Sequence, residues 1–479
     1  MRLPNPMRAA RTPAGALAAA LLALAPLSAA AAPPPAPPPP APVPLAPGNP
    51  DPLMAWAEAV APDAAFRAAV ARGVTAAPQV GEAQAAVAEA LGVRAEVRAA
   101  LRPRVEVEVS GQQVISRDFS NDPDNILERS RPERRADAVL AAEQLITDFG
   151  ASRARLAAAG AQARAARARV AAVAEEAALQ AVAAWLALRL GEAQVTLADA
   201  LIVRHETILA ATRERARAGA GAEGDVARVE SFLEAARAER ARAAAEIERA
   251  RARWVQALQS APPAAGDAPD RPSAPALPAG GLDEALAAAR ASPSVQAAAA
   301  RIASAERELA AARAARLPRL TTGIDAAKFS LGEDVVDHDV RARLTLRHNL
   351  YAGGAQAARI DQAAARLRQG EFLAERTRQE AERLAAEAFA NARALDDQSV
   401  ALRAAYVASR RTRDLYAEQF RLARGSLLEL LRAEADLSSA AQIWLDRLAQ
   451  RDLARYTLLA RTGRLLDHLG IEVAEEGAP

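Results

Sequence analysis

The sequence contains the same series of landmarks twice, and this duplication constrains the fold more than any other feature. The matched landmarks are Pro78 and Pro103 with Pro293 and Pro318, Gly150 with Gly354, and Asp225 with Glu429. The proline pairs are offset by 215 residues and the later markers by 204. An offset that stays constant over about 75 residues leaves no room for insertions, so the two copies contain elements of equal length. The fold must therefore hold two equivalent units.

The composition favours long, thin helical packing over a thick globular core. Hydrophobic residues make up 51% of the chain but aromatic residues only 3%, and much of the remainder is alanine. Alanine is the best helix former but buries little apolar surface. With 61 basic and 59 acidic residues the net charge is only +2, so the composition gives no reason to expect a nucleic acid partner.

The N-terminal residues have the pattern of a secretory signal peptide, which we assign to residues 1–30. Arg2, Arg8 and Arg11 precede an apolar stretch, and a small-residue cleavage site follows at Ser28-Ala29-Ala30. The Pro/Ala-rich residues 31–54 and the C-terminal residues 471–479 are expected to be disordered. The chain has no cysteine, which fits an oxidising compartment entered without disulfides and excludes a lipidated N-terminal cysteine.

The periodicity of each unit predicts a helix, a pair of strands, and a long helical hairpin. The first unit, residues 55–260, has predicted strands at about 104–116 and 134–147 and a hairpin at about 150–259. A proline-rich connector, 261–281, separates it from the second unit, residues 282–470. That unit has predicted strands at about 319–329 and 340–351 and a hairpin at about 354–463. The first long helix extends over roughly 105 Å at 1.5 Å per residue.

The predicted strands are long enough to cross a membrane. A tilted membrane strand needs roughly 9 to 11 residues, and these strands alternate apolar with charged residues. We find no uninterrupted apolar run of 18 residues after the signal peptide, so we expect no membrane-spanning helix. Four strands cannot close into a barrel, and open edges are not tolerated in lipid, so other copies of the chain must complete the sheet. The alternative is a soluble antiparallel sheet with one wet face.

Several segments resemble the TolC-type outer membrane efflux proteins over about residues 55–470. They are Leu350-Tyr351-Ala352-Gly353-Gly354, the weaker Ile146-Thr147-Asp148-Phe149-Gly150, the turn from Phe420 to Glu434, the Leu317-Pro318 pair, and the ending with Thr462-Gly463-Arg464-Leu465-Leu466. No single one of these motifs is specific for the family, but the duplicated order of all of them is specific.

The resemblance implies a homotrimer with a twelve-stranded β-barrel continued by a long α-helical barrel. The fold class is thus mainly α with a small transmembrane β portion. The resemblance also implies a passive exit duct, without enzymatic activity, in the outer membrane of a Gram-negative-type envelope with a large periplasmic portion. The implied partners are outer membrane lipid, a periplasmic adaptor protein, and an inner-membrane ABC or proton-driven transporter.

The sequence leaves three functional hypotheses open: two classes of cargo for a duct, and a different class of protein. Type I protein secretion is the first hypothesis, because Gln419-Phe420 and the segment Ser426 to Leu431 resemble the secretion branch and a lipidated cysteine is absent. Multidrug or small-molecule efflux by the same fold is the alternative. A soluble periplasmic coiled-coil scaffold or adaptor is the third hypothesis, although an adaptor would have one helical hairpin rather than two.

The two hairpin turns are the candidate periplasmic entrance and adaptor contact. The residues assigned to them are Gly219, Gly221, Asp225, Arg228, Ala423, Gly425, Ser426, Glu429 and Arg432. In the family a glycine lies six residues before an acid at each turn. Gly219 and Asp225 fit this pattern, but in the second copy Ala423 stands in place of the glycine, which we interpret as having moved to position 425. The acids either attract cations and hold the closed state, or simply favour the N-termini of the return helices through the dipole.

A second group of candidates belongs to the barrel and its junctions with the helices. Arg341, Arg343 and Arg347 alternate with apolar residues and are predicted to line the barrel lumen, because lipid would disfavour them. Gly150, Tyr351, Gly353 and Gly354 mark the strand-to-helix junctions, and Tyr351 is a candidate for the interfacial belt.

No motif predicts a cofactor, a metal or a catalytic site. The four histidines are scattered and have no cysteine beside them, and Gly353-Gly354 lacks the Lys-Ser/Thr of a phosphate loop. We therefore expect no enzyme.

Overall fold

The computed structural model describes residues 52–473 except 60–62, 117–125, 127–132, 265, 268, 270, 332–336 and 423. These residues lie in one compact unit, Pro44–Pro479. The predicted signal peptide, most of the Pro/Ala-rich segment, residues 474–479 and Ala423 lie outside the described residues.

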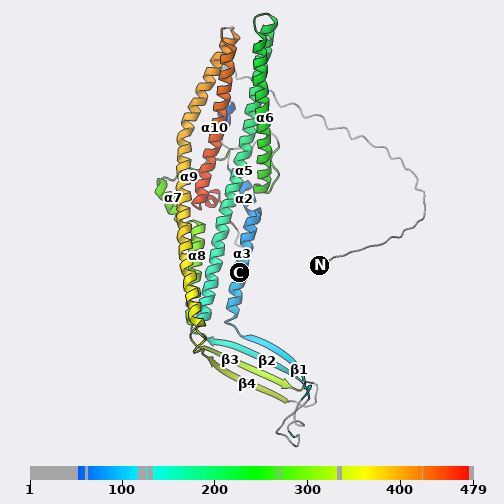
Figure 1. Cartoon of the computed structure of the whole chain (residues 1–479), viewed down its shortest axis with the longest axis vertical. Helices are drawn as coiled ribbons and strands as arrows, with labels where there is room; N and C mark the ends of the chain where they lie inside the picture. Colours follow the sequence, from blue (N-terminus) through cyan, green and yellow to red (C-terminus); the bar gives the residue numbers. More distant parts are fainter. Residues whose placement is uncertain are drawn as a thin grey trace, which may run out of the picture. The chain divides into compact units, whose positions relative to one another are not determined.

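The elements follow the duplicated order that the sequence predicts (Figure 1). The first copy contains α1 (Pro52–Glu58), α2 (Ala64–Ala76), α3 (Pro78–Ala99), β1 (Arg104–Gln113), β2 (Arg134–Thr147), α5 (Ala151–Arg217) and α6 (Glu223–Leu258). The second contains α7 (Gly281–Arg290), α8 (Pro293–Ala314), β3 (Arg319–Phe329), β4 (Asp337–Arg347), α9 (Ala355–Arg421), α10 (Leu427–Arg461) and α11 (Leu465–Leu469). The prediction of a mainly helical chain with a small antiparallel sheet is confirmed.

The equal spacing of the sequence markers reflects helices of equal length. The long helices α5 and α9 each have 67 residues, and α3 and α8 each have 22. Both long helices begin directly after a glycine with positive φ, Gly150 at 101° and Gly354 at 83°. Other residues rarely adopt this left-handed conformation, so a glycine is needed where each strand turns into its helix.

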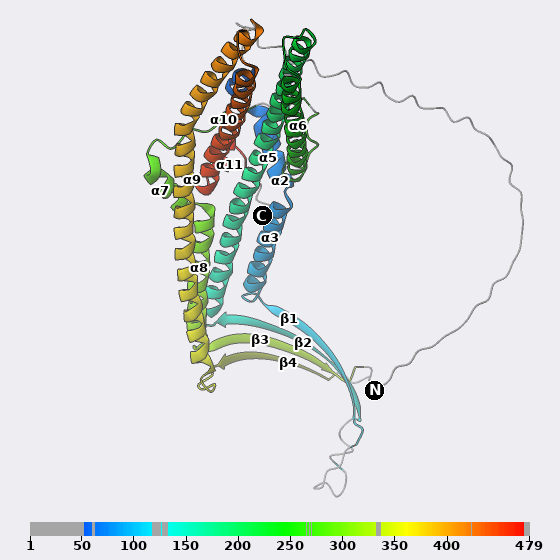
Figure 2. The ribbon, with the colours of Figure 1, turned by 45° about the horizontal axis from the view of Figure 1, so that its top comes forward.

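The four strands form one antiparallel sheet in the order β1-β2-β3-β4. Within each copy the two strands pair with each other, and β2 pairs with β3 to join the copies. Because β2 and β4 lead directly into α5 and α9, the sheet lies at one end of the long helices (Figure 2).

Two predicted strand ends need correction. The first strand ends at Gln113 rather than 116, and the last residue it pairs with is Arg134, the first residue of β2. The fourth strand was predicted at 340–351 but extends from Asp337 to Arg347. Arg347 pairs with Arg319, and the residue before Arg319 is Pro318, which has no N–H to extend the ladder. Tyr351 therefore lies beyond the strand.

The helices pack as two hairpins, α5 with α6 and α9 with α10, with α3 and α8 beside the strand-proximal halves of the long helices (Figures 1 and 2). The largest core cluster joins α2, α3, α5, α6, α10 and α11 and includes several aromatic residues. The ring centroids of Phe66 and Trp185 are 5.4 Å apart, and those of Trp185 and Trp254 are 5.1 Å apart. Nearer the sheet, between Ala151 and Ala165, six of the seven buried residues of α5 are alanine, which lets helices approach closely.

One helix tests the expectation that no helix could span a membrane. By length and composition α5 is sufficient to cross, with a window of mean hydropathy 1.4. Within that window 61% is buried inside the protein. Because this window contains scattered polar residues, it is not an uninterrupted apolar run and the sequence did not predict it. Since most of the window is buried inside the protein, α5 is a core helix.

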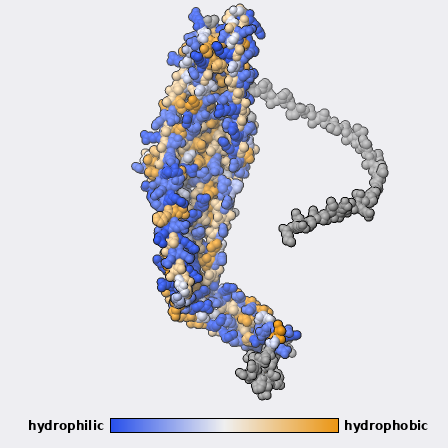
Figure 3. Space-filling view, in the orientation of Figure 1, coloured by the Kyte–Doolittle hydropathy of each residue, from blue (hydrophilic) through white to orange (hydrophobic). Residues whose placement is uncertain are grey.

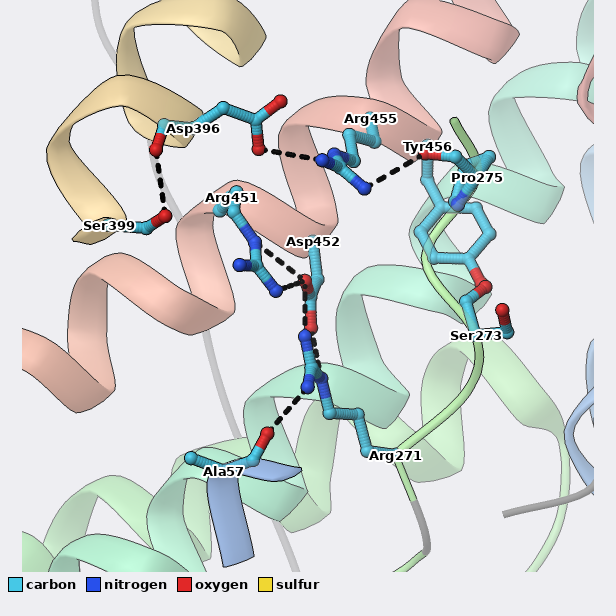
Figure 4. A network of polar contacts seen from close by, with 10 residues as sticks. All are labelled: Ala57, Arg271, Ser273, Pro275, Asp396, Ser399, Arg451, Asp452, Arg455 and Tyr456. Atoms are coloured by element: carbon cyan, nitrogen blue, oxygen red, sulfur yellow. Dashed lines mark hydrogen bonds and ion pairs between the residues drawn. The ribbon is translucent and has the colours of Figure 1, made fainter. Parts of the chain in front are cut away.

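The proline-rich connector between the copies is docked on α10 rather than acting only as a spacer (Figure 4). The guanidinium of Arg271 donates to both carboxylate oxygens of Asp452, at 2.7 and 3.0 Å, and to the carbonyl of Ala57 at 2.6 Å. The hydroxyl of Tyr456 donates to the carbonyl of Ser273 at 2.9 Å. These contacts fasten both the connector and α1 to the second hairpin.

Candidate functional site

The two hairpin turns share a backbone hydrogen bond at equivalent positions. In the first, the N–H of Ala220 donates to the carbonyl of Arg215 at 2.9 Å, and in the second Arg424 donates to Gln419 at 2.8 Å. These residues are again offset by 204. The loss of glycine at position 423 therefore does not alter the hydrogen bond that closes the second turn.

The second glycine of each turn is the shared one, which corrects the interpretation that a glycine had moved. Gly425 is offset from Gly221 by 204 and is therefore its counterpart. A Cβ at Gly221 would lie 3.3 Å from the nitrogen of Ala216, and one at Gly425 only 3.0 Å from the nitrogen of Phe420. Both turns thus need a glycine where the chain passes close to the end of the preceding helix.

The acids and arginines after the turns differ between the copies. Asp225 and Arg228 form an ion pair of 3.7 Å across one turn of α6. Glu429 and Arg432 have the same spacing on α10 and are both exposed, but among the described residues they form no ion pair. The first carboxylate is therefore partly neutralised, whereas the second remains available to a ligand or a neighbouring chain.

Near the turns, side chains of the first hairpin bind the second. The guanidinium of Arg215 on α5 lies 4.0 Å from the ring centroid of Phe420 on α9 and donates to its carbonyl oxygen. Around this contact lies an apolar cluster from both hairpins: Ile208, Leu209, Val229, Leu233, Phe420, Leu430 and Leu431. These contacts hold the two hairpins together at the turns.

A buried charged group forms a second connection, further from the turns. Glu434 on α10 lies 2.9 Å from Arg204 of α5 and 3.4 Å from Arg413 of α9. The side chains of Glu434 and Arg413 are only 3% and 7% exposed. Beside them, burial lowers the pKa of His205, while the charge of Glu434 opposes that shift. One carboxylate thus ties together helices from both copies.

The sequence search missed this connection. Arg204, Arg413 and Glu434 belong to three helices, and nothing in their local sequence separates them from the many solvated arginines and glutamates. The one local feature that could have indicated a buried charge is the pair Arg204-His205, which follows an apolar segment of α5.

The register of the sheet places an apolar face on all four strands. Residues directly opposite in a ladder share a face, and the rows Val105–Ala142–Ile324–Ala342 and Val107–Leu140–Ala326–Val340 are apolar throughout. The large side chains of this face are nevertheless exposed: Val105, Val107, Val109, Leu140, Ile324, Val340, Leu344 and Leu346. Apolar side chains are visible over the sheet in Figure 3.

The predicted lumen arginines lie on the opposite, polar face. Arg341, Arg343 and Arg347 alternate with Ala342, Leu344 and Leu346 and are all exposed. Two of them have acidic partners on the same face, since Arg341 lies 2.9 Å from Asp339 and Arg343 lies 3.0 Å from Asp325. The alternation that separates a wet face from an apolar face is therefore present in the folded sheet.

The strand-to-helix junctions expose large apolar residues next to their glycines. Tyr351 is 85% exposed and Leu350 is 88% exposed, just before Gly353 and Gly354. In the first copy Phe149, next to Gly150, is 55% exposed. The interfacial role of Tyr351 stays a prediction.

Comparison with known proteins agrees with this geometry. Residues 285–464 match the model of the outer membrane efflux protein family. No curated protein matches the chain at a significant level.

Solved structures match over most of the chain. The outer membrane protein VceC from Vibrio cholerae matches with a TM-score of 0.73 and 16% identity, covering 84% of this chain and 96% of that one. The open state of the MtrE outer membrane channel from Neisseria gonorrhoeae matches with a TM-score of 0.72 and 22% identity, covering 84% and 89%. A membrane protein from Pseudomonas aeruginosa matches with a TM-score of 0.73 and 22% identity, covering 85% and 95%. At these identities the likeness establishes the fold.

The duplicated hairpins and the four-stranded antiparallel sheet make up the fold of the TolC-type outer membrane channels. The family match in the second copy agrees with this fold and confirms the resemblance found in the sequence. The match to the outer membrane efflux protein family covers the second copy, and the solved channel structures share the fold of the whole chain.

Proposed function

We propose that three copies of the chain form a twelve-stranded barrel and a continuous helical tunnel that serves as an exit duct. The single observation that supports this most is the apolar face shared by all four strands and exposed in one chain. Lipid would cover that face, while the outer edges of β1 and β4 would pair with neighbouring copies, because unpaired edges are not tolerated in lipid.

The helical portion would form the periplasmic part of the duct. A helix of 67 residues is about 100 Å long at 1.5 Å per residue. The hairpin turns lie at the end of the helices furthest from the sheet and would form the entrance. There Asp225 and Glu429 would present carboxylates, and the contacts of Arg215 and Glu434 would hold the hairpins in place. A periplasmic adaptor and an inner-membrane transporter would dock at this end.

Two cargo classes are supported by different observations. Type I protein secretion is supported by the resemblance of Gln419-Phe420 and the segment from Ser426 to Leu431 to the secretion branch. Small-molecule efflux is supported by the efflux family match over residues 285–464. Deletion of the gene separates them: loss of an exoprotein from the medium supports secretion, whereas accumulation of dyes or drugs in the cell supports efflux.

The membrane role of the sheet can be tested with two neighbouring substitutions on β4. Leu344 belongs to the apolar face and Thr345 to the polar face, and both are exposed. An arginine facing lipid costs about 2–4 kcal/mol at the bilayer midplane and far less in a lumen. Leu344→Arg should therefore abolish or greatly reduce the heat-modifiable oligomer in the outer membrane fraction, while Thr345→Arg should preserve it. Equal behaviour of the two variants would contradict a membrane barrel.

A further inference from the structure

Two arginines face each other where the sheet meets the helices. Arg319 is the first residue of β3 and Arg347 the last of β4, and their Cα atoms are direct partners in the ladder. Both residues are exposed. By alternation they share the polar face with Arg341 and Arg343, whereas the next pair, Leu320 and Leu346, is on the apolar face.

Unlike their neighbours, these two arginines have no acidic partner among the residues that the structure describes. On the same face, Arg341 pairs with Asp339, Arg343 with Asp325, and Arg104 with Glu106. Throughout the described ranges, neither Arg319 nor Arg347 forms an ion pair with a carboxylate. The pair is therefore a local excess of two positive charges.

An acid just beyond the ladder, Asp148, is hydrogen-bonded to the start of α5 and forms no ion pair with either arginine. Asp148 follows Thr147, which pairs with Leu320 beside Arg319. The Oδ2 atom of Asp148 accepts the N–H of Ser152 at 2.8 Å and also the hydroxyl of Ser152. This carboxylate thus stabilises the start of α5.

Like charges placed directly opposite in a sheet are unfavourable unless something compensates them. Two guanidinium groups on directly paired residues suit an anion with at least two oxygens, because each planar fork can donate two hydrogen bonds to a carboxylate or phosphate. The juxtaposition thus has the chemistry of an anion site.

We propose that Arg319 and Arg347 form an anion-binding site at the junction of barrel and helices that favours cargo with carboxylate or phosphate groups. The proposal rests on the proposed function, since a trimer would bring three such pairs, six arginines in all, to one level of the lumen. The duct would therefore prefer anions at the junction of barrel and helices. This site is separate from the carboxylates at the entrance turns.

The same chemistry could be met by a second source, the phosphate of a lipid headgroup, if this face were turned to the membrane. The exposed apolar residues on the other face argue for a lumenal position. The experiment must nevertheless separate an anion in the lumen from a lipid phosphate.

The test uses the full-length protein in planar bilayers of zwitterionic lipid under a KCl gradient. For the wild-type channel we expect chloride to be preferred over potassium, and inorganic phosphate to block the current. In the double variant Arg319→Gln/Arg347→Gln, the chloride-to-potassium permeability ratio should fall several-fold and phosphate block should weaken by a similar factor. The matched control, Asp325→Asn/Arg343→Gln, removes a balanced ion pair from the same face and should leave both quantities unchanged.

The outcomes distinguish a failure of the anion site from a failure of the proposed duct. A conducting wild-type channel that phosphate does not block, or a double variant with an unchanged permeability ratio, overturns the anion site and leaves the duct standing. Absence of any conductance in the wild type instead contradicts the proposed function.

A separate measurement tests whether the two arginines bind the phosphate of a lipid headgroup. The heat-dissociation temperature of the oligomer is compared in vesicles with and without phosphatidylglycerol. If anionic lipid stabilises the wild type but not the double variant, while phosphate block is the same in both, the arginines bind headgroups and the lumenal site is wrong.

Discussion

At the scale of single residues, Glu175 on α5 is a buried carboxylate that holds the C-terminal helix in place. It accepts the N–H of Leu465 at 3.1 Å and that of Leu466 at 3.4 Å, and it is only 5% exposed. Burial raises the pKa of this carboxyl to about 7, and the nearby Asp467 adds to the increase, although the two N–H donors oppose it. The folded state therefore binds a proton at Glu175 more tightly than the unfolded state.

This pKa predicts a specific dependence of stability on pH. Because the folded pKa is above the ordinary value of 4.5, the contribution is fully present below about pH 4.5 and is lost as pH rises to about 7. Relative to Glu175→Gln, the wild type should lose about 3 kcal/mol over this range. Thermal unfolding midpoints in detergent at pH 5 and pH 7.5 check this. The control Glu176→Gln alters an exposed neighbour that pairs with Arg461, and should leave the wild-type pH dependence unchanged.

At the scale of elements, the close approach at Gly425 makes the second turn sensitive to a single methyl group. In Gly425→Ala the new Cβ would lie 3.0 Å from both the Cβ of Gln419 and the nitrogen of Phe420. We expect a destabilisation of about 1–3 kcal/mol confined to the turn. Trypsin should therefore cleave faster at Arg421 and Arg424. Gly224→Ala, where a Cβ meets nothing within 4 Å, is the matched control, and equal cleavage of the two variants would refute the tight turn.

Glu434 connects elements of both copies, so its loss should loosen the entrance. Glu434→Gln would remove the carboxylate between Arg204 and Arg413 and leave buried positive charge, although Arg413 keeps Asp414 at 2.9 Å. Breaking a buried pair typically costs about 3 kcal/mol. Single-channel conductance in planar bilayers should rise. Glu418→Gln breaks only an exposed pair with Arg421 and should not change the conductance; a wild-type value for Glu434→Gln would exclude this connection from gating.

Local patterns in the sequence were sufficient for the elements but not for the contacts between them. Strict alternation at Val105, Val107 and Val109 predicted the first strand, and matched glycines and prolines predicted helices of equal length. The pairing of Arg271 with Asp452 was not predictable, because the two residues are 181 positions apart and no periodic pattern relates them. The fourth strand was misplaced because its end depends on its partner: Pro318 ends the ladder at Arg347.

At the scale of the whole molecule, the duplication explains why one chain is insufficient. Each copy contributes one strand pair and one long hairpin, and together they make a four-stranded sheet with two outer edges and an exposed apolar face. Such a surface is stable in lipid only when the edges are paired. The duplicated chain thus represents one third of the proposed cylinder.

The mass of the detergent-solubilised oligomer tests this claim most directly. Native mass spectrometry of the protein extracted from the outer membrane should give three times the mass of the mature chain, with dissociation to single chains on heating. A stable monomer that remains soluble without detergent and does not bind lipid would contradict the account.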